Sequence, residues 1–162
     1  MATEAQKRER QNRMFNMVIA GMSKGLYDLF GEAAVSVITP IGEEILEEME
    51  HELGLEIHGE NPQEILTEIE RLLMDEYGMF KDGSLEIHPD THEVDVLITD
   101  SALWHATAEL HEAGLPPLAC VEMMVTGAAL RKRLGRKAKF VGLKLDDQTR
   151  TIDIDFHMYD ED

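Results

Sequence analysis

Apolar side chains in the first half of the chain recur every three or four residues, which is the period of an amphipathic helix. This pattern predicts a first helix over residues 4–30 and a second over 32–53. Pro40 is expected to kink or divide the second helix, because proline lacks the amide donor that a helix interior needs. A third helix is expected over 62–78, since Asn61 before a proline is a good N-cap.

The second half of the chain contains two pairs of segments in which apolar and polar residues alternate. The first pair covers 84–88 and 92–99, and the second covers 138–145 and 149–159. Alternation of period two is typical of half-buried strands, so each pair predicts a β-hairpin. The turn of the first hairpin is expected at 89–91.

Two helices are expected between these hairpins. Asp100 or Ser101 should cap the first, which Gly114 should end. Pro116 and Pro117 should start the second, which would place its cysteine four residues inside the helix.

The resulting order of elements is ααα-ββ-αα-ββ. It predicts an α+β domain in which a four-stranded antiparallel sheet, made of two hairpins, packs on one face against about five helices. We expect residues 1–162 to form a single domain, with 1–30 as a helical dimerisation element and 31–162 as the core.

The net charge of the chain limits the classes of partner that it is expected to bind. It has 33 acidic and 15 basic residues, a net charge of −18, and this acidic character argues against nucleic acid or an anionic membrane as a partner. A single cysteine forms no internal disulfide, so we expect a cytoplasmic protein. Residues 131–139 hold six of the basic residues. They suit a helix C-terminus, with an anionic-partner site as the alternative.

Two segments carry a resemblance to a known family. They are GLYDLFGEAAVSVITPIGEEILEEM at 25–49 and PPLACVEMMVTGAALRKRLGRK at 116–137. With the order of elements, they make the chain similar to the archaeal and bacterial 4-vinyl reductase domain family, also described as hydrocarbon-binding. That family is related in fold to haem-nitric-oxide-binding domains and to small subunits of vesicle-tethering complexes.

The resemblance implies an apolar pocket between helices and sheet, and a homodimer formed through the N-terminal helices. It also implies a zinc site in many members, where Cys120 would be joined by cysteines of the last hairpin. That hairpin has no cysteine here, so Cys120 would be the remnant of such a site.

The stretch WHATAELHEAGLPPLAC at 104–120 is the main candidate site. Trp104 and His111 are seven residues apart and share a helix face, whereas His105 and His111 are separated by roughly 240°. We expect the domain to bind a small hydrophobic ligand, aromatic or isoprenoid, and to act as a sensor or carrier of it. Its predicted contacts are Trp104, His111, Phe30, Met123 and Met124. Ordinary core packing is the alternative for Trp104 and the methionines, and a hydrogen bond near the surface is the alternative for His111.

Two other functions stay open at this point. One is a metal- or haem-binding protein, or a reductase-like enzyme, that uses His105, His111 or Cys120, with zinc as the candidate metal. The sequence requires no cofactor, and it shows no phosphate loop or nucleophile elbow, which disfavours an independent enzyme. The other is a protein-interaction subunit. Asp153, Asp155 and His157 share one face of the last strand and are expected to be solvated.

Overall fold

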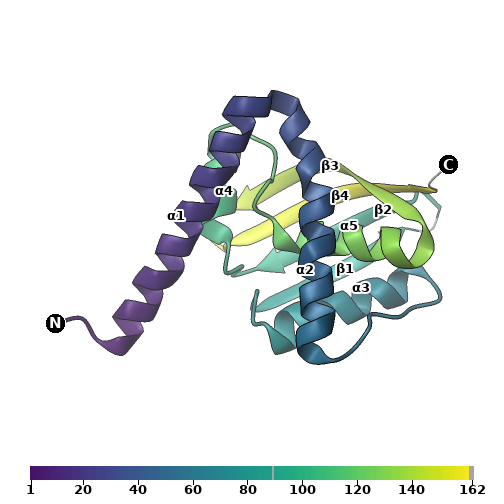
Figure 1. The fold of residues 1–162 in the computed structure, drawn as a ribbon, viewed down its shortest axis with the longest axis horizontal. Coiled ribbons are helices and arrows are strands. Elements are labelled where there is room, and N and C mark those ends of the chain that lie inside the picture. The colour runs from purple at the N-terminus through teal and green to yellow at the C-terminus, as the bar shows by residue number, and fades with distance from the viewer. Residues whose placement is uncertain (89, 161–162) are drawn as a thin grey trace.

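The computed structural model describes residues 1–88 and 90–160 and confirms the α+β class (Figure 1). Its elements are α1 (Glu4–Phe30), the 3₁₀ helix η1 (Gly31–Val37), α2 (Ile38–Leu53), α3 (Pro62–Arg71), the π-helical turn η2 (Leu72–Glu76), β1 (Asp82–His88), β2 (Glu93–Thr99), α4 (Trp104–Glu112), α5 (Val121–Leu134), β3 (Arg136–Asp146) and β4 (Thr151–Asp160). No helix in the described part of the chain is long and apolar enough to cross a membrane.

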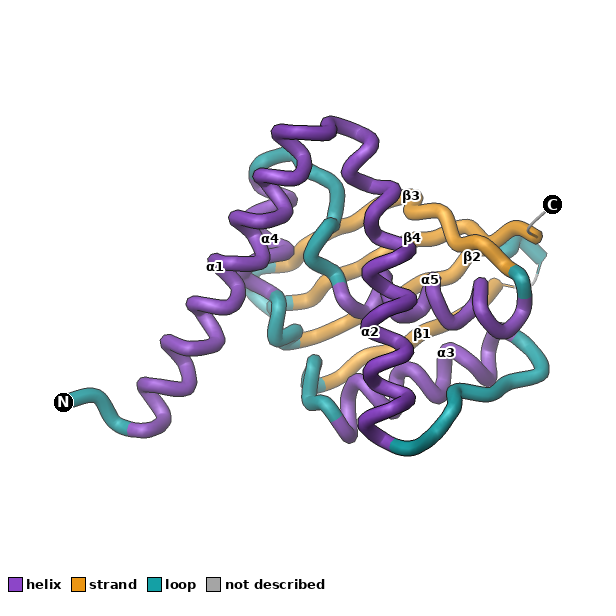
Figure 2. The backbone as a smooth tube through the Cα atoms, viewed as in Figure 1, coloured by secondary structure: helices purple, strands orange, loops and turns teal. Residues whose placement is uncertain are grey.

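The four strands form one antiparallel sheet in the order β1-β2-β4-β3, so the two predicted hairpins join through β2 and β4. The helices cover one face of the sheet (Figure 2). α3 packs on β1, and α5 lies between β3 and α2. The covered face is the core of the domain, with Val94, Val96, Ile98, Ile152, Ile154 and Phe156 buried. Pro89, in the predicted turn of the first hairpin, lies outside the described residues.

Helix α1 packs in a different way from the one its apolar pattern suggests. Its buried residues are Asn16, Ala20 and Ser23, whereas most of its large apolar side chains are exposed. Asn16 donates to the carbonyl of Ala102 at 2.8 Å and accepts from the amide of Ala106 at 2.9 Å. These bonds fix α1 to the start of α4, so the contact depends on small and polar groups rather than on the apolar stripe.

Helices α2 and α5 cross closely at Gly42. A Cβ atom at this position would lie 2.3 Å from the carbonyl oxygen of Met124, so only glycine fits. Further along, the buried Glu50 of α2 accepts from the amide of Ile57 at 2.8 Å and pairs with Arg133 of α5. Although burial alone would raise it, these two partners lower the pKa of the Glu50 carboxyl.

Several boundaries differ from the sequence-based expectation. Helix α4 begins at Trp104 and neither Asp100 nor Ser101 is its N-cap residue, because the Ser101 hydroxyl donates to Glu122 and Asp100 pairs with Arg150. Pro40 falls in the first turn of α2, where a proline is tolerated, so the helix is continuous from Ile38. Helix α5 begins at Val121 rather than at the two prolines, because residues 115–120 form a loop with a turn at Leu118 and Ala119. Cys120 is therefore the N-cap residue of α5, not a residue inside the helix.

Strand β3 carries a bulge that alters the side chains on the open face of the sheet. Phe140 pairs with Phe156 and Gly142 with Asp155, so the residue between them has no partner. The extra residue brings Lys139 and Lys144 to the same face, although a regular strand would put them on opposite faces. Lys144 lies 3.5 Å from Asp153 and 3.8 Å from Asp155.

Candidate functional site

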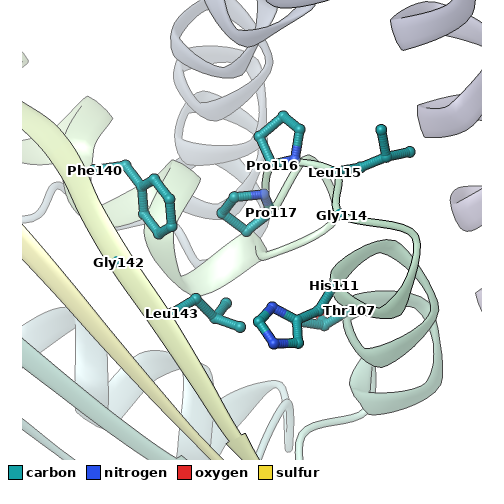
Figure 3. A pocket seen from close by; sticks show the side chains of 9 residues that line it. All are labelled: Thr107, His111, Gly114, Leu115, Pro116, Pro117, Phe140, Gly142 and Leu143. Atoms are coloured by element: carbon teal, nitrogen blue, oxygen red, sulfur yellow. The ribbon is translucent and has the colours of Figure 1, made fainter.

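A cavity of about 360 Å³ lies between α4, the loop that follows it and strand β3 (Figure 3). Two of its lining residues, Thr107 and His111, come from consecutive turns of α4, and the His111 ring points across the cavity toward Leu143. The other walls are apolar or backbone: Gly114, Leu115, Pro116, Pro117, Phe140 and Gly142.

A second cavity of about 500 Å³ adjoins the first and extends along α5. The two cavities share Gly114, Pro116, Pro117 and Phe140 as walls. The second is bounded by η1 and the start of α2 on one side and by β3 and β4 on the other. Its large apolar side chains are Val35, Ile38, Met123, Met124, Phe140 and Phe156.

The structure brings together three of the five predicted ligand contacts. His111 lines the first cavity, and Met123 and Met124 line the second. Trp104 lines neither of these cavities; it is buried in the main core, with the Arg150 guanidinium 5.8 Å from its ring centre. Phe30 is 58% exposed at the end of α1 and also lies outside both cavities.

The candidate metal ligands do not form a cluster. His105 and His111 are exposed, whereas Cys120 is fully buried. Among residues 1–88 and 90–160, no group of three or more histidine, cysteine, aspartate or glutamate side chains could hold a metal ion. Helical spacing separates the two histidines, and the loop before α5 carries Cys120 away from both.

Cys120 instead belongs to a buried polar cluster at the start of α5. Its thiol donates to Glu122 at 3.3 Å, and the Ser101 hydroxyl donates to the other oxygen of the same carboxyl at 3.1 Å. Burial, followed by the charge of Glu122, raises the pKa of the Cys120 thiol well above its usual range. A nucleophile or metal ligand must be a thiolate, so this cysteine is held in an unreactive form.

Burial also raises the pKa of the Glu122 carboxyl, although its hydrogen bonds lower it in part. Neither hydrogen bond comes from a basic side chain, so the ionised carboxylate is costly in this position. Sequence reasoning missed this residue because it lies in the first turn of α5, where a glutamate is ordinarily solvated and favourable.

Phe140 was not predicted as a cavity wall, and Thr107 was not among the predicted ligand contacts. Thr107 precedes His111 by four residues, so helical spacing alone indicates a shared face. Phe140 alternates with lysine on β3, which indicates that it faces the helices. The cavity itself depends on the loop at 115–120, which the pattern around Pro116 and Pro117 did not distinguish from a helix start.

Comparison with curated proteins finds no match to the chain, whereas comparison with protein-family models finds one. A protein-family model matches residues 15–155, which run from the middle of α1 into β4 and include the lining of both cavities except Phe156 and Tyr159 of the second. This match covers well over half of the sequence. The chain therefore belongs to the family described as "Putative rubredoxin C-terminal domain".

Proposed function

We propose that this domain binds a small apolar molecule in the two adjoining cavities and acts as a sensor or carrier of it. The observation that carries the proposal is the cavity of about 500 Å³ between α2, α5 and the sheet. Ligand pockets are mostly apolar and measure about 300–1,000 Å³, with a few polar groups that orient the ligand. Methionine side chains such as Met123 and Met124 adapt readily to ligands of different shape.

The resemblance to the 4-vinyl reductase or hydrocarbon-binding domains supports the same proposal. It rests on the segments 25–49 and 116–137, which contribute η1, the start of α2 and much of α5 to the cavity walls. The ligand class is therefore proposed to be aromatic or isoprenoid.

Gly127 offers a direct test of the cavity. It lines the cavity on α5, and a Cβ atom there would have no neighbour within 4 Å. Gly127→Leu should fill part of the cavity while the domain stays folded, and Gly127→Ala is the matched control. Isothermal titration with 1-octanol should show binding to the wild type and to Gly127→Ala, and at least tenfold weaker binding to Gly127→Leu. Equal binding by all three proteins, or binding by none, would overturn the proposal.

The family description associates this domain with rubredoxin, whose iron is held by four cysteine thiolates. The chain contains one cysteine, and that residue is buried and hydrogen-bonded to Glu122. Its own residues therefore do not fit a rubredoxin-type iron, and we assign the domain no electron-transfer step. The proposed binding role does not require one.

A second proposed function is self-association through α1. Seven large apolar residues of this helix are at least half exposed: Met14, Phe15, Met17, Val18, Met22, Leu29 and Phe30. α1 also holds five basic and three acidic residues, which leaves ten basic and thirty acidic residues in the rest of the chain. A basic helix with an exposed apolar face is complementary to the acidic body of a second copy.

Native mass spectrometry tests this association. The wild type should be a homodimer, and Phe15→Glu combined with Met22→Glu should be a monomer that melts at a similar temperature. Val141→Glu is the control, because Val141 is an exposed apolar residue on β3 at 63% exposure. A monomeric wild type, or a double variant that remains dimeric, would contradict the proposal.

A further inference from the structure

Thr107 is a buried polar residue whose hydroxyl has no partner. Its side chain is 2% exposed, and among the residues that the structure describes nothing accepts from or donates to its Oγ1 atom. In a helix a threonine hydroxyl commonly bonds the carbonyl four residues earlier; here the Leu103 carbonyl accepts only the Thr107 amide, at 3.0 Å. A buried hydroxyl without a partner is unfavourable by about 1–3 kcal/mol, so its place at a cavity wall calls for an explanation.

His111 is the second polar group on the same wall. It follows Thr107 by one helical turn, and both residues line the cavity of Figure 3. No hydrogen bond or ion pair joins its ring to another residue in the described ranges 1–88 and 90–160. The facing side chains, Phe140 and Leu143 among them, supply no polar atom that could pair with either group.

From these contacts we infer that the ligand carries a hydroxyl group, which Thr107 and His111 bind together at the α4 end of the cavities. The inference rests on the proposed function and specifies the ligand as an apolar alcohol. A hydroxyl both donates and accepts, so it can bond to a threonine oxygen and an imidazole nitrogen at once. A χ1 rotation exchanges Oγ1 with the methyl group of Thr107, which presents the oxygen to the cavity without moving α4.

The apolar part of the ligand would extend from this end along Phe140 toward Met123 and Met124. Phe140 is a wall of both cavities, so one molecule can contact the polar pair and the apolar walls of the larger cavity. A carboxylate fits this end less well, because the only side chain of the smaller cavity that can be cationic is the imidazole of His111. The ionised carboxylate would lose its hydration in the smaller cavity, and no permanently charged side chain of its lining would compensate for that loss.

Three ligands of matched length separate the alternatives: 1-octanol, octyl methyl ether and octanoate. The alcohol donates and accepts, the ether only accepts, and octanoate is an anion. Isothermal titration should show that the alcohol binds roughly three- to tenfold more tightly than the ether, which is the usual range for one additional hydrogen bond. Octanoate should bind more weakly than the alcohol at pH 8, because its carboxylate would lose hydration on entering the cavity.

The decisive variant is Thr107→Val, with Thr107→Ser as the conservative control. Valine removes the hydroxyl and keeps the shape, so we expect the ligand-free protein to melt at the same or a higher temperature. It should also abolish the preference for the alcohol over the ether, while Thr107→Ser should retain it. A merely structural role of Thr107 would change the two affinities equally.

The outcomes are distinct from those that test the cavity. If neither the alcohol nor the ether binds the wild type, the proposed function itself is wrong. If both bind with equal affinity, or if Thr107→Val keeps the preference for the alcohol, the apolar cavity stands and the hydroxyl-binding pair is refuted.

Discussion

The close crossing of α2 and α5 makes Gly42→Ala the most informative single substitution for the fold. The added Cβ would lie 2.3 Å from the Met124 carbonyl oxygen and 2.8 Å from its carbonyl carbon. Both atoms belong to the backbone, so no side chain can rotate away. Ordinary contact begins near 3.4 Å, and the two helices would therefore have to separate by about 1 Å.

The expected change in the free energy of unfolding combines two opposing contributions, helix preference and overpacking. Alanine is better than glycine in a helix interior by about 0.5–1 kcal/mol. Overpacking a rigid contact costs about 1–3 kcal/mol, and here the added Cβ meets backbone atoms of Met124 that cannot rotate away. We therefore expect a net loss of about 1–2 kcal/mol in the free energy of unfolding. In a domain of this size each kcal/mol corresponds to roughly 2–4 °C, so the melting temperature should fall by about 2–8 °C.

Differential scanning calorimetry measures this change, with Gly127→Ala as the control on the partner helix. That control gains the same helical preference without a neighbour within 4 Å, so it should melt at or above the wild-type temperature. Gly42→Ala should also change the affinity for 1-octanol, because α2 and α5 both line the larger cavity. A Gly42→Ala protein as stable as Gly127→Ala would show that the helices do not approach this closely.

Three further predictions concern the buried polar residues. Burial raises the pKa of folded Glu122 above its unfolded value near 4.5, so the contribution of Glu122 to stability should decline as pH rises from there through the raised value. In urea unfolding from pH 4 to 8, the stability of the wild type relative to Glu122→Gln should therefore decrease with pH, and parallel curves would contradict this. Glu50 has a lowered pKa, so its contribution to stability should be present above about pH 4.5 and lost as pH falls. Glu50→Gln should lower the free energy of unfolding by up to about 3 kcal/mol at pH 7 and by less in acid. A variant as stable as the wild type at pH 7 would show that the pair with Arg133 does not stabilise the fold. The Cys120 thiol should resist Ellman's reagent at pH 8 in the folded protein and react at once in urea; rapid labelling of the folded protein would show that the thiol is accessible.

The fold was largely predictable because its signals are local. Alternation over 92–99 and 149–159 identified β2 and β4, and Asn61 with Pro62 identified the start of α3, where Asn61 accepts from the amide of Glu64 at 3.1 Å. The start of α5 was missed because Pro116 and Pro117 suit both an extended loop and a first helical turn. Only tertiary packing distinguishes these two conformations.

The candidate site was predicted only in part, because the sequence pattern does not show which elements pack against one another. Helical spacing placed Trp104 and His111 on one face, and the adaptability of methionine favoured Met123 and Met124. His111, Met123 and Met124 line the cavities, whereas Trp104 and the equally favoured Phe30 do not. Periodicity gives the face of a helix but not the neighbour that covers it: Trp104 faces the main core and Phe30 faces solvent.

The bulge in β3 has a consequence for how molecules of this protein meet. β3 is an edge strand, and an edge of regular pairing can add a strand from another molecule and start aggregation. The unpaired Val141 interrupts the regular spacing of backbone donors and acceptors along that edge, and Lys139 and Lys144 place positive charge beside it. Growth of the sheet from one molecule to the next is thereby opposed, and the exposed face of α1 is left as the surface proposed for self-association.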